Sequence, residues 1–188
     1  MNRTKTIEIA GKTYLLCYST RVVRAVTDKF GSPVKMNEVI RNNASPAERV
    51  EALLFVLHEM ILAGARFAKR EDIQNPPPLT LDELHTLYPL IKPRTAYNTI
   101  KDAIIYGSAV AFDVKDKPQR GKKKTPKKTK MTPERYVYYG LQMGLDYDTA
   151  LDLPHGELLS YINIDQVAKD MATEIYHNDE EEPFPDWE

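Results

Sequence analysis

The first residues that could do chemistry are a histidine and a glutamate within an apolar stretch, His58-Glu59. Zinc proteases place such a pair on a helix with a second histidine four residues after the first, so that both imidazoles face one metal ion. Position 62 is a leucine, and the remaining histidines, His85, His155 and His177, are scattered along the chain. The sequence therefore indicates no zinc site, and we interpret His58 as a partly buried core or interface side chain.

Three aspartates near the C-terminal end, Asp146, Asp148 and Asp152, could suggest a calcium-binding loop. The glycine and the terminal glutamate that complete such a loop do not fall at the required offsets. We therefore interpret Asp146 as a helix cap and the other two aspartates as part of a solvated helix face.

The chain has one cysteine, Cys17, so it cannot form an internal disulfide, and a buried structural thiol is the expected role. It has neither a glycine-rich phosphate loop nor a G-x-S-x-G nucleophile elbow. No apolar run reaches the roughly 20 residues that a membrane span needs, and no secretion signal is recognisable. These observations predict a cytoplasmic, non-enzymatic protein without a metal ion or cofactor.

The net charge of −1 conceals three segments of different charge. Residues 1–114 contain 15 basic and 12 acidic side chains, residues 115–130 contain 9 and 1, and residues 131–188 contain 2 and 14. The middle segment is apolar only at its prolines, so it cannot bury enough surface to offset the entropy of ordering. We predict four parts: a helical domain at 1–114, a flexible Lys/Pro-rich linker at 115–131, a small helical module at 132–177 and an acidic disordered tail at 178–188.

Hydrophobic periodicity predicts a mainly α fold with a small N-terminal β-hairpin. The hairpin covers residues 5–17, with a tight turn at Gly11-Lys12. The clearest helix begins at Ser45, where a proline follows the cap and Glu48 completes a capping box, and it continues to Lys69. Other helices are expected after the caps Ser19 and Thr80, around Val34, and from Arg94 to Ala111. The last of these is expected to have Ala96, Ile100, Ile104 and Ile105 facing inward.

The small module is expected to contain a helix from Pro133 to Gly144, a short helix after Asp146 and a last helix from Pro154. Tyr136, Tyr139 and Met143 fall at i, i+3 and i+7 on one face of the first of these helices. One interpretation is that they form the core of the module. The alternative is a partner-binding patch that also includes Tyr147, since tyrosine and methionine are favoured at protein interfaces.

The lysine run of the linker allows an alternative function, a nucleic-acid-binding regulatory protein, because such runs bind phosphate backbones. The helix–glycine–helix pattern at 133–152 also loosely resembles a helix-turn-helix. Residues 131–188 would however repel DNA by their net charge of −12, and the linker has no interleaved aromatic residues for stacking on single strands. We do not expect nucleic acid to be the partner.

Four stretches of the chain resemble the tail assembly chaperones of siphophages that infect Gram-positive bacteria. The first three correspond to the N-terminal module of that family, and the fourth to its second module. They are IEIAGKTYLLCYSTRVVRAVTDKFGS, ERVEALLFVLHEMILAGARFAKRE, NPPPLT and YVYYGLQMGLDYDTALDLPHGELLSYINIDQ. The resemblance covers most of the chain outside the linker and the acidic tail.

The resemblance implies that the first module binds the tape measure protein and that the second recruits major tail tube subunits in the host cytoplasm. The family is absent from the mature virion. It commonly makes a short product and a frameshifted long product, and Lys122-Lys123-Lys124 is our hypothesis for the frameshift seam, because lysine codons are adenine-rich. We leave open whether the helix from Pro46 to Lys69 also carries a self-association surface.

Overall fold

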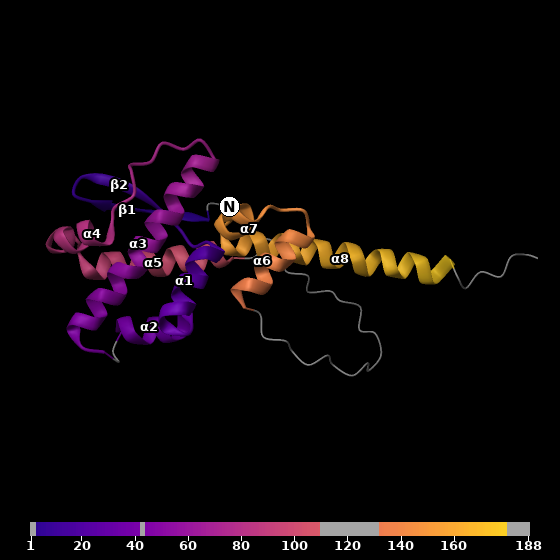
Figure 1. The fold of residues 1–188 in the computed structure, drawn as a ribbon, viewed down its shortest axis with the longest axis horizontal. Coiled ribbons are helices and arrows are strands. Elements are labelled where there is room, and N and C mark those ends of the chain that lie inside the picture. Colours follow the sequence, from indigo (N-terminus) through magenta and orange to yellow (C-terminus); the bar gives the residue numbers. More distant parts are fainter. Residues whose placement is uncertain (1–2, 42–43, 110–131, 180–188) are drawn as a thin grey trace, which may run out of the picture.

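A computed structural model describes residues 3–41, 44–109 and 132–179 of the 188-residue chain (Figure 1). Over these residues the chain forms eight α-helices, one 3₁₀ turn and one two-stranded antiparallel hairpin. This confirms the predicted mainly α fold with a small N-terminal hairpin. The predicted linker at 115–131, with Lys122, Lys123 and Lys124, lies outside the described residues. We call residues 3–109 the first module and residues 132–179 the second module.

The hairpin pairs β1 (Thr4–Ile9) with β2 (Lys12–Cys17). Because Ile9 pairs with Lys12, the two-residue turn is Ala10-Gly11, and the predicted turn at Gly11-Lys12 was wrong by one residue. Both turn residues have positive φ, 49° at Ala10 and 73° at Gly11. A two-residue turn of this kind matches the twist of the strands, and an alanine in the left-handed region is uncommon enough to escape prediction.

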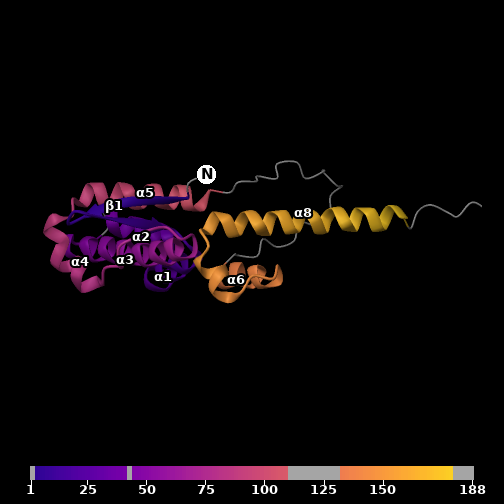
Figure 2. The same cartoon turned by 90° about the horizontal axis from the view of Figure 1, so that it is seen from above.

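The central helix of the first module is α3 (Pro46–Arg70), and its predicted capping box between Ser45 and Glu48 is present. Its apolar surface is wide, so the hairpin covers one side and other helices cover the rest. Figure 2 shows the hairpin between α3 and α5 (Pro93–Ser108). Gly64 allows the closest approach, because a Cβ at this position would lie 1.8 Å from the carbonyl oxygen of Leu15 in β2.

Two shorter helices, α1 (Thr20–Phe30) and α2 (Pro33–Arg41), follow the hairpin. The Ser19 side chain caps α1 by accepting a hydrogen bond from the Val22 amide, and Gly31 ends the helix with φ of 80°. A glycine is favoured there because the left-handed region strains other residues. The start and the end of α1 therefore confirm the prediction.

The remaining elements of the first module are α4 (Leu81–Leu87), a 3₁₀ turn at Tyr88–Leu90, and α5. The buried residues of α5 include Ala96, Ile100, Ala103 and Gly107, whereas Ile105 is 53% exposed. The expectation that Ile105 faces inward was therefore wrong. Consecutive residues of a helix point about 100° apart, and the buried stripe continues through Gly107 instead, which packs closely against Tyr18.

The second module contains α6 (Pro133–Gln142), α7 (Tyr147–Asp152) and α8 (His155–Asp179). The α8 helix ends two residues beyond the predicted end of the module at position 177. It begins beside the end of α5 and projects away from the body of the first module (Figures 1 and 2). None of the described helices is long and apolar enough to cross a lipid bilayer.

Candidate partner-binding surface

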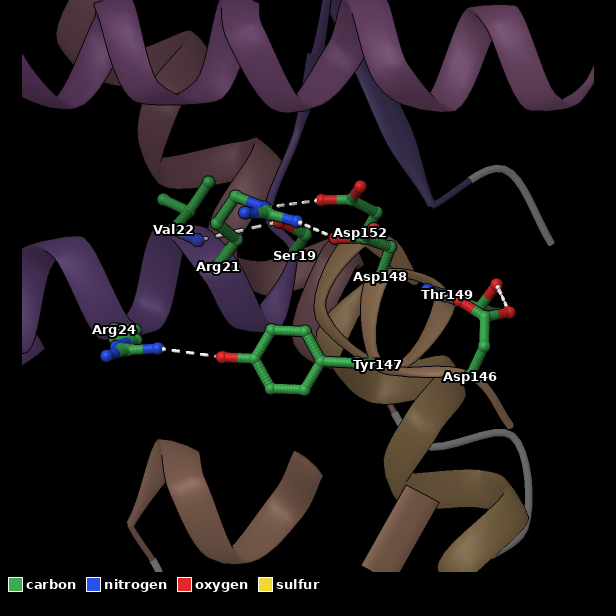
Figure 3. A network of polar contacts seen from close by, with 9 residues as sticks. All are labelled: Ser19, Arg21, Val22, Arg24, Asp146, Tyr147, Asp148, Thr149 and Asp152. Atoms are coloured by element: carbon green, nitrogen blue, oxygen red, sulfur yellow. Dashed lines mark hydrogen bonds and ion pairs between the residues drawn. The ribbon is translucent and has the colours of Figure 1, made fainter. Parts of the chain in front are cut away.

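The two modules contact each other, mainly through α1 and α5 of the first module and all three helices of the second. We call the residues that join them the module interface. Its polar side is built on Arg21 of α1, which donates from Nε to Asp152 Oδ1 at 2.7 Å and from Nη2 to Asp148 Oδ1 at 3.0 Å (Figure 3). These aspartates were expected on a solvated helix face. Asp148, whose side chain is 80% exposed, does lie on such a face, whereas Asp152 is only 18% exposed. Both pair with Arg21, which lies 127 and 131 positions earlier in the chain.

Backbone contacts fix the other side of the module interface. The His155 amide donates to the Tyr18 carbonyl oxygen at 2.9 Å, and Ser19 forms an isolated antiparallel bridge with Pro154. The first turn of α8 approaches the end of α5 so closely that a Cβ on Gly156 would lie 2.3 Å from the carbonyl oxygen of Ala109. This hydrogen-bonded and closely packed contact places the start of α8 against the end of α5.

His155 is a buried polar side chain of the module interface, with 8% of its surface exposed. Its ring meets Tyr136 edge-on at 4.7 Å and Tyr18 edge-on at 6.3 Å between centroids, and its Nδ1 lies 3.2 Å from the Thr20 hydroxyl oxygen. Burial disfavours the charged imidazolium and lowers the pKa of His155 to about 4. The imidazole is therefore neutral at pH 7 and acts as a packing group.

The structure divides the predicted partner-binding residues between the interior and the surface. Tyr136 and Met143 are partly buried against the cluster formed by Leu153, Leu158 and Ile162, and burial raises the pKa of Tyr136. Their side chains contribute to the packing of the module, which was the first of the two interpretations for this face, not the partner-binding alternative.

Tyr139 and Tyr147 are the exposed members of the predicted set, with 36% and 50% of their surfaces accessible. The Tyr147 hydroxyl accepts a hydrogen bond from Arg24 Nη1 at 3.1 Å (Figure 3). This bond holds the ring of Tyr147 between α7 and α1. Binding of a partner by these side chains stays a prediction.

Sequence reasoning missed two more exposed apolar residues of α6, Tyr138 (57% exposed) and Leu141 (42% exposed). With Tyr147 and Val137 they line a shallow groove of about 180 Å³ beside Arg24 of α1. We call Tyr138, Leu141 and Tyr147 the aromatic surface. Tyr138 and Leu141 are three residues apart, the same helical spacing as Tyr136 and Tyr139, so the sequence contains a second stripe that could have been considered.

The residues first considered for chemistry have structural contacts in the described part of the chain. His58 Nδ1 lies 3.3 Å from Glu59 Oε1 on α3, and Asp146 caps α7 by accepting from the Thr149 amide at 2.9 Å, as predicted. Over the described residues no group of three or more histidine, cysteine, aspartate or glutamate side chains is placed to hold a metal ion. Cys17 is fully buried, and burial raises the pKa of its thiol to about 12.

Comparisons of the chain with known protein families, with curated protein sequences and with solved structures give no significant match.

Proposed function

We propose that this chain is a non-enzymatic tail assembly chaperone of a long-tailed bacteriophage. In this proposal the first module binds the tape measure protein, and the second module recruits tail tube subunits. The proposal rests on the order of the two modules and on their resemblance to the family. The observation that supports it most directly is the aromatic surface. Other side chains fill the core of the second module, so the exposed residues of this surface are free to contact a partner.

The chemistry of this surface suits a protein partner. Large exposed apolar side chains cost free energy in water, and tyrosines beside an arginine are enriched at the centres of protein interfaces. Tyr138, Leu141 and Tyr147 come from α6 and α7, and Arg24 of α1 borders them. A partner bound here would contact both modules, so the module interface would form part of its binding surface.

Coexpression tests the first half of the proposal. The chain is produced together with the large coiled-coil-rich protein encoded directly downstream, and the soluble fraction of that protein is measured. We expect the large protein to be soluble only when this chain is present. Equal solubility with and without the chain would contradict a chaperone function.

A pull-down of the tail tube protein encoded in the same gene cluster tests the second half. The double variant Tyr138→Ser/Leu141→Ser should recover at least about tenfold less tube protein, since truncated interface hot spots typically cost 2 kcal/mol or more. Tyr161→Ser is the matched control, because Tyr161 is a 43% exposed tyrosine on α8 outside the groove. Unchanged recovery with the double variant would remove the aromatic surface from the proposal.

A further inference from the structure

A second hollow lies on the first module, at the end opposite the second module. It has a volume of about 580 Å³ and is bordered by the end of α2, the start of α3 and the start of α5. Tyr88 and Tyr97 line it together with Pro46, Pro93 and the buried Leu53. Aromatic rings and prolines form similar floors in grooves that bind extended, proline-containing peptides. We call this hollow the arginine pocket, for the side chains that surround it.

Three arginines from three different helices line the arginine pocket: Arg41, Arg49 and Arg94. None of them forms an ion pair within the described part of the chain, although Glu48 lies in the same turn as Arg49. The Glu48 carboxylate accepts hydrogen bonds from Ser45 in the capping box. Three cations around one hollow repel one another and create a local field that attracts an anion.

Two of these arginines stand where a helix would favour an acid. Arg49 and Arg94 lie in the first turns of α3 and α5. The helix dipole makes the N-terminal turn electropositive, so a basic side chain there is unfavourable by a few tenths of a kcal/mol. Two arginines in this position therefore do not stabilise their helices, and their charges favour an anionic ligand.

The chain itself contains a segment with matching chemistry. Residues 180–188, EEEPFPDWE, carry five acidic side chains and no basic one. Phe184 lies between two prolines, and Trp187 follows three residues later. Carboxylates can accept paired hydrogen bonds from the arginine guanidinium groups. The rings of Phe184 and Trp187 can pack against the tyrosine and proline side chains of the pocket. We infer that the arginine pocket binds residues 180–188 of a second copy of this chain.

The direction of α8 places this contact between copies. The arginine pocket lies at the start of α5, and the module interface lies at its end, about 24 Å away for a 16-residue helix. From there α8 runs toward the opposite end of the molecule over 25 residues, which is about 37 Å (Figures 1 and 2). Nine residues span at most about 30 Å. The segment therefore cannot return to the pocket of its own chain.

A contact in which the end of one copy enters the pocket of the next is heterologous, so it joins copies head to tail. This inference goes beyond the proposed function and does not depend on it, because it rests on the pocket and on the chemistry of residues 180–188.

Trp187 is the only tryptophan of the chain, so its fluorescence reports directly on the segment. The purified full-length chain is diluted over a wide concentration range, and the emission maximum and the sedimentation coefficient are measured together. We expect both to change with concentration, with bluer emission in the associated state, and we expect added salt to oppose association. A synthetic peptide of residues 177–188 should dissociate the copies.

The decisive variant is Arg49→Glu/Arg94→Glu, which should weaken association by at least about tenfold. Arg66→Glu is the control for the single variants Arg49→Glu and Arg94→Glu, because Arg66 is exposed on α3 outside the arginine pocket and each single variant changes the charge by the same amount. Circular dichroism checks that each variant is folded, and Phe184→Ser, which alters the proposed ligand segment and leaves residues 3–179 unchanged, should weaken association in the same way.

Four outcomes would overturn the inference. They are a chain that sediments as a monomer at every concentration, a blue shift that does not depend on concentration, association that survives Arg49→Glu/Arg94→Glu, and equal loss of association in Arg66→Glu. A downstream protein kept soluble by a variant that no longer associates would leave the proposed function in place.

Discussion

Acid should weaken the attachment of the second module, because His155 is buried in the module interface beside uncharged groups. Its ring contacts the rings of Tyr18 and Tyr136, and its Nδ1 faces the Thr20 hydroxyl. Burial lowers its pKa from 6.5 to about 4. The unfolded chain therefore binds a proton more tightly than the folded chain between these values. The stability present above pH 6.5 is consequently lost as the pH falls toward 4.

The size of the effect follows from the pKa difference. Each pKa unit corresponds to about 1.4 kcal/mol, so protonation should cost about 2 kcal/mol of unfolding free energy between pH 7 and pH 5 and about 3 kcal/mol by pH 4. The side chain is 8% exposed, so screening by solvent reduces these figures little. A loss of this size is a large part of the stability of a small domain.

Urea unfolding followed by circular dichroism at pH 7, 6 and 5 measures the loss, with His155→Gln as the comparison. The variant should lose about 1 kcal/mol at pH 7 through its missing ring contacts, and it should then be less sensitive to pH than the wild type. Measurements stop at pH 5 because hydrogen bonds to Glu48, Glu83 and Asp146 lower the pKa values of these carboxyls. Their stabilisation is present above their ordinary values and is lost only at lower pH. Equal pH dependence of the two proteins would refute the assignment to His155.

Three further predictions concern the packing of the body and the module interface. Gly64→Ala should lower the unfolding free energy by about 3 kcal/mol or more, because its Cβ would lie 1.8 Å from the Leu15 carbonyl oxygen, and a urea titration measures this. Arg21→Ala should lower the unfolding free energy by about 1 kcal/mol at low salt, because it removes the ion pairs with Asp148 and Asp152. A loss that does not shrink in 1 M salt would contradict an electrostatic origin. Cys17 should not react with a thiol reagent at pH 8 in the folded chain, since burial raises its pKa to about 12, and it should react fully in urea; rapid reaction of the native protein would show that the thiol is accessible.

The features that the sequence predicted correctly are those set by neighbouring residues. The capping boxes that open α3 and α4 each depend on two side chains three positions apart, Ser45 with Glu48 and Thr80 with Glu83. The inward face of α5 was only partly predicted, because Ile104 and Ile105 are equally apolar. The contact of Gly107 with Tyr18 decides which side of the helix is covered, and no local pattern encodes that contact.

The module interface could not be predicted from local patterns. Arg21 and Asp152 are ordinary charged residues at their own positions, and only the folded chain brings them within 2.7 Å. The same limit applies to the aromatic surface. Helix α6 has apolar residues on more than one face, and the positions of α7 and α8 determine that Tyr136 is partly covered while Tyr138 is exposed.

The module interface also imposes an order on events during synthesis. Arg3 leaves the ribosome among the first residues, but Ser160, to which its guanidinium donates, follows 157 positions later. At roughly 5–20 residues per second, the 51 residues from the end of the first module at position 109 to Ser160 take about 3–10 seconds, and in that time the first module can pack before its counterpart exists. During that interval the face of α1 that carries Arg21 and Arg24 is uncovered. Other proteins can therefore contact this face of a nascent chain only for a limited time, because the second module covers it once translation is complete.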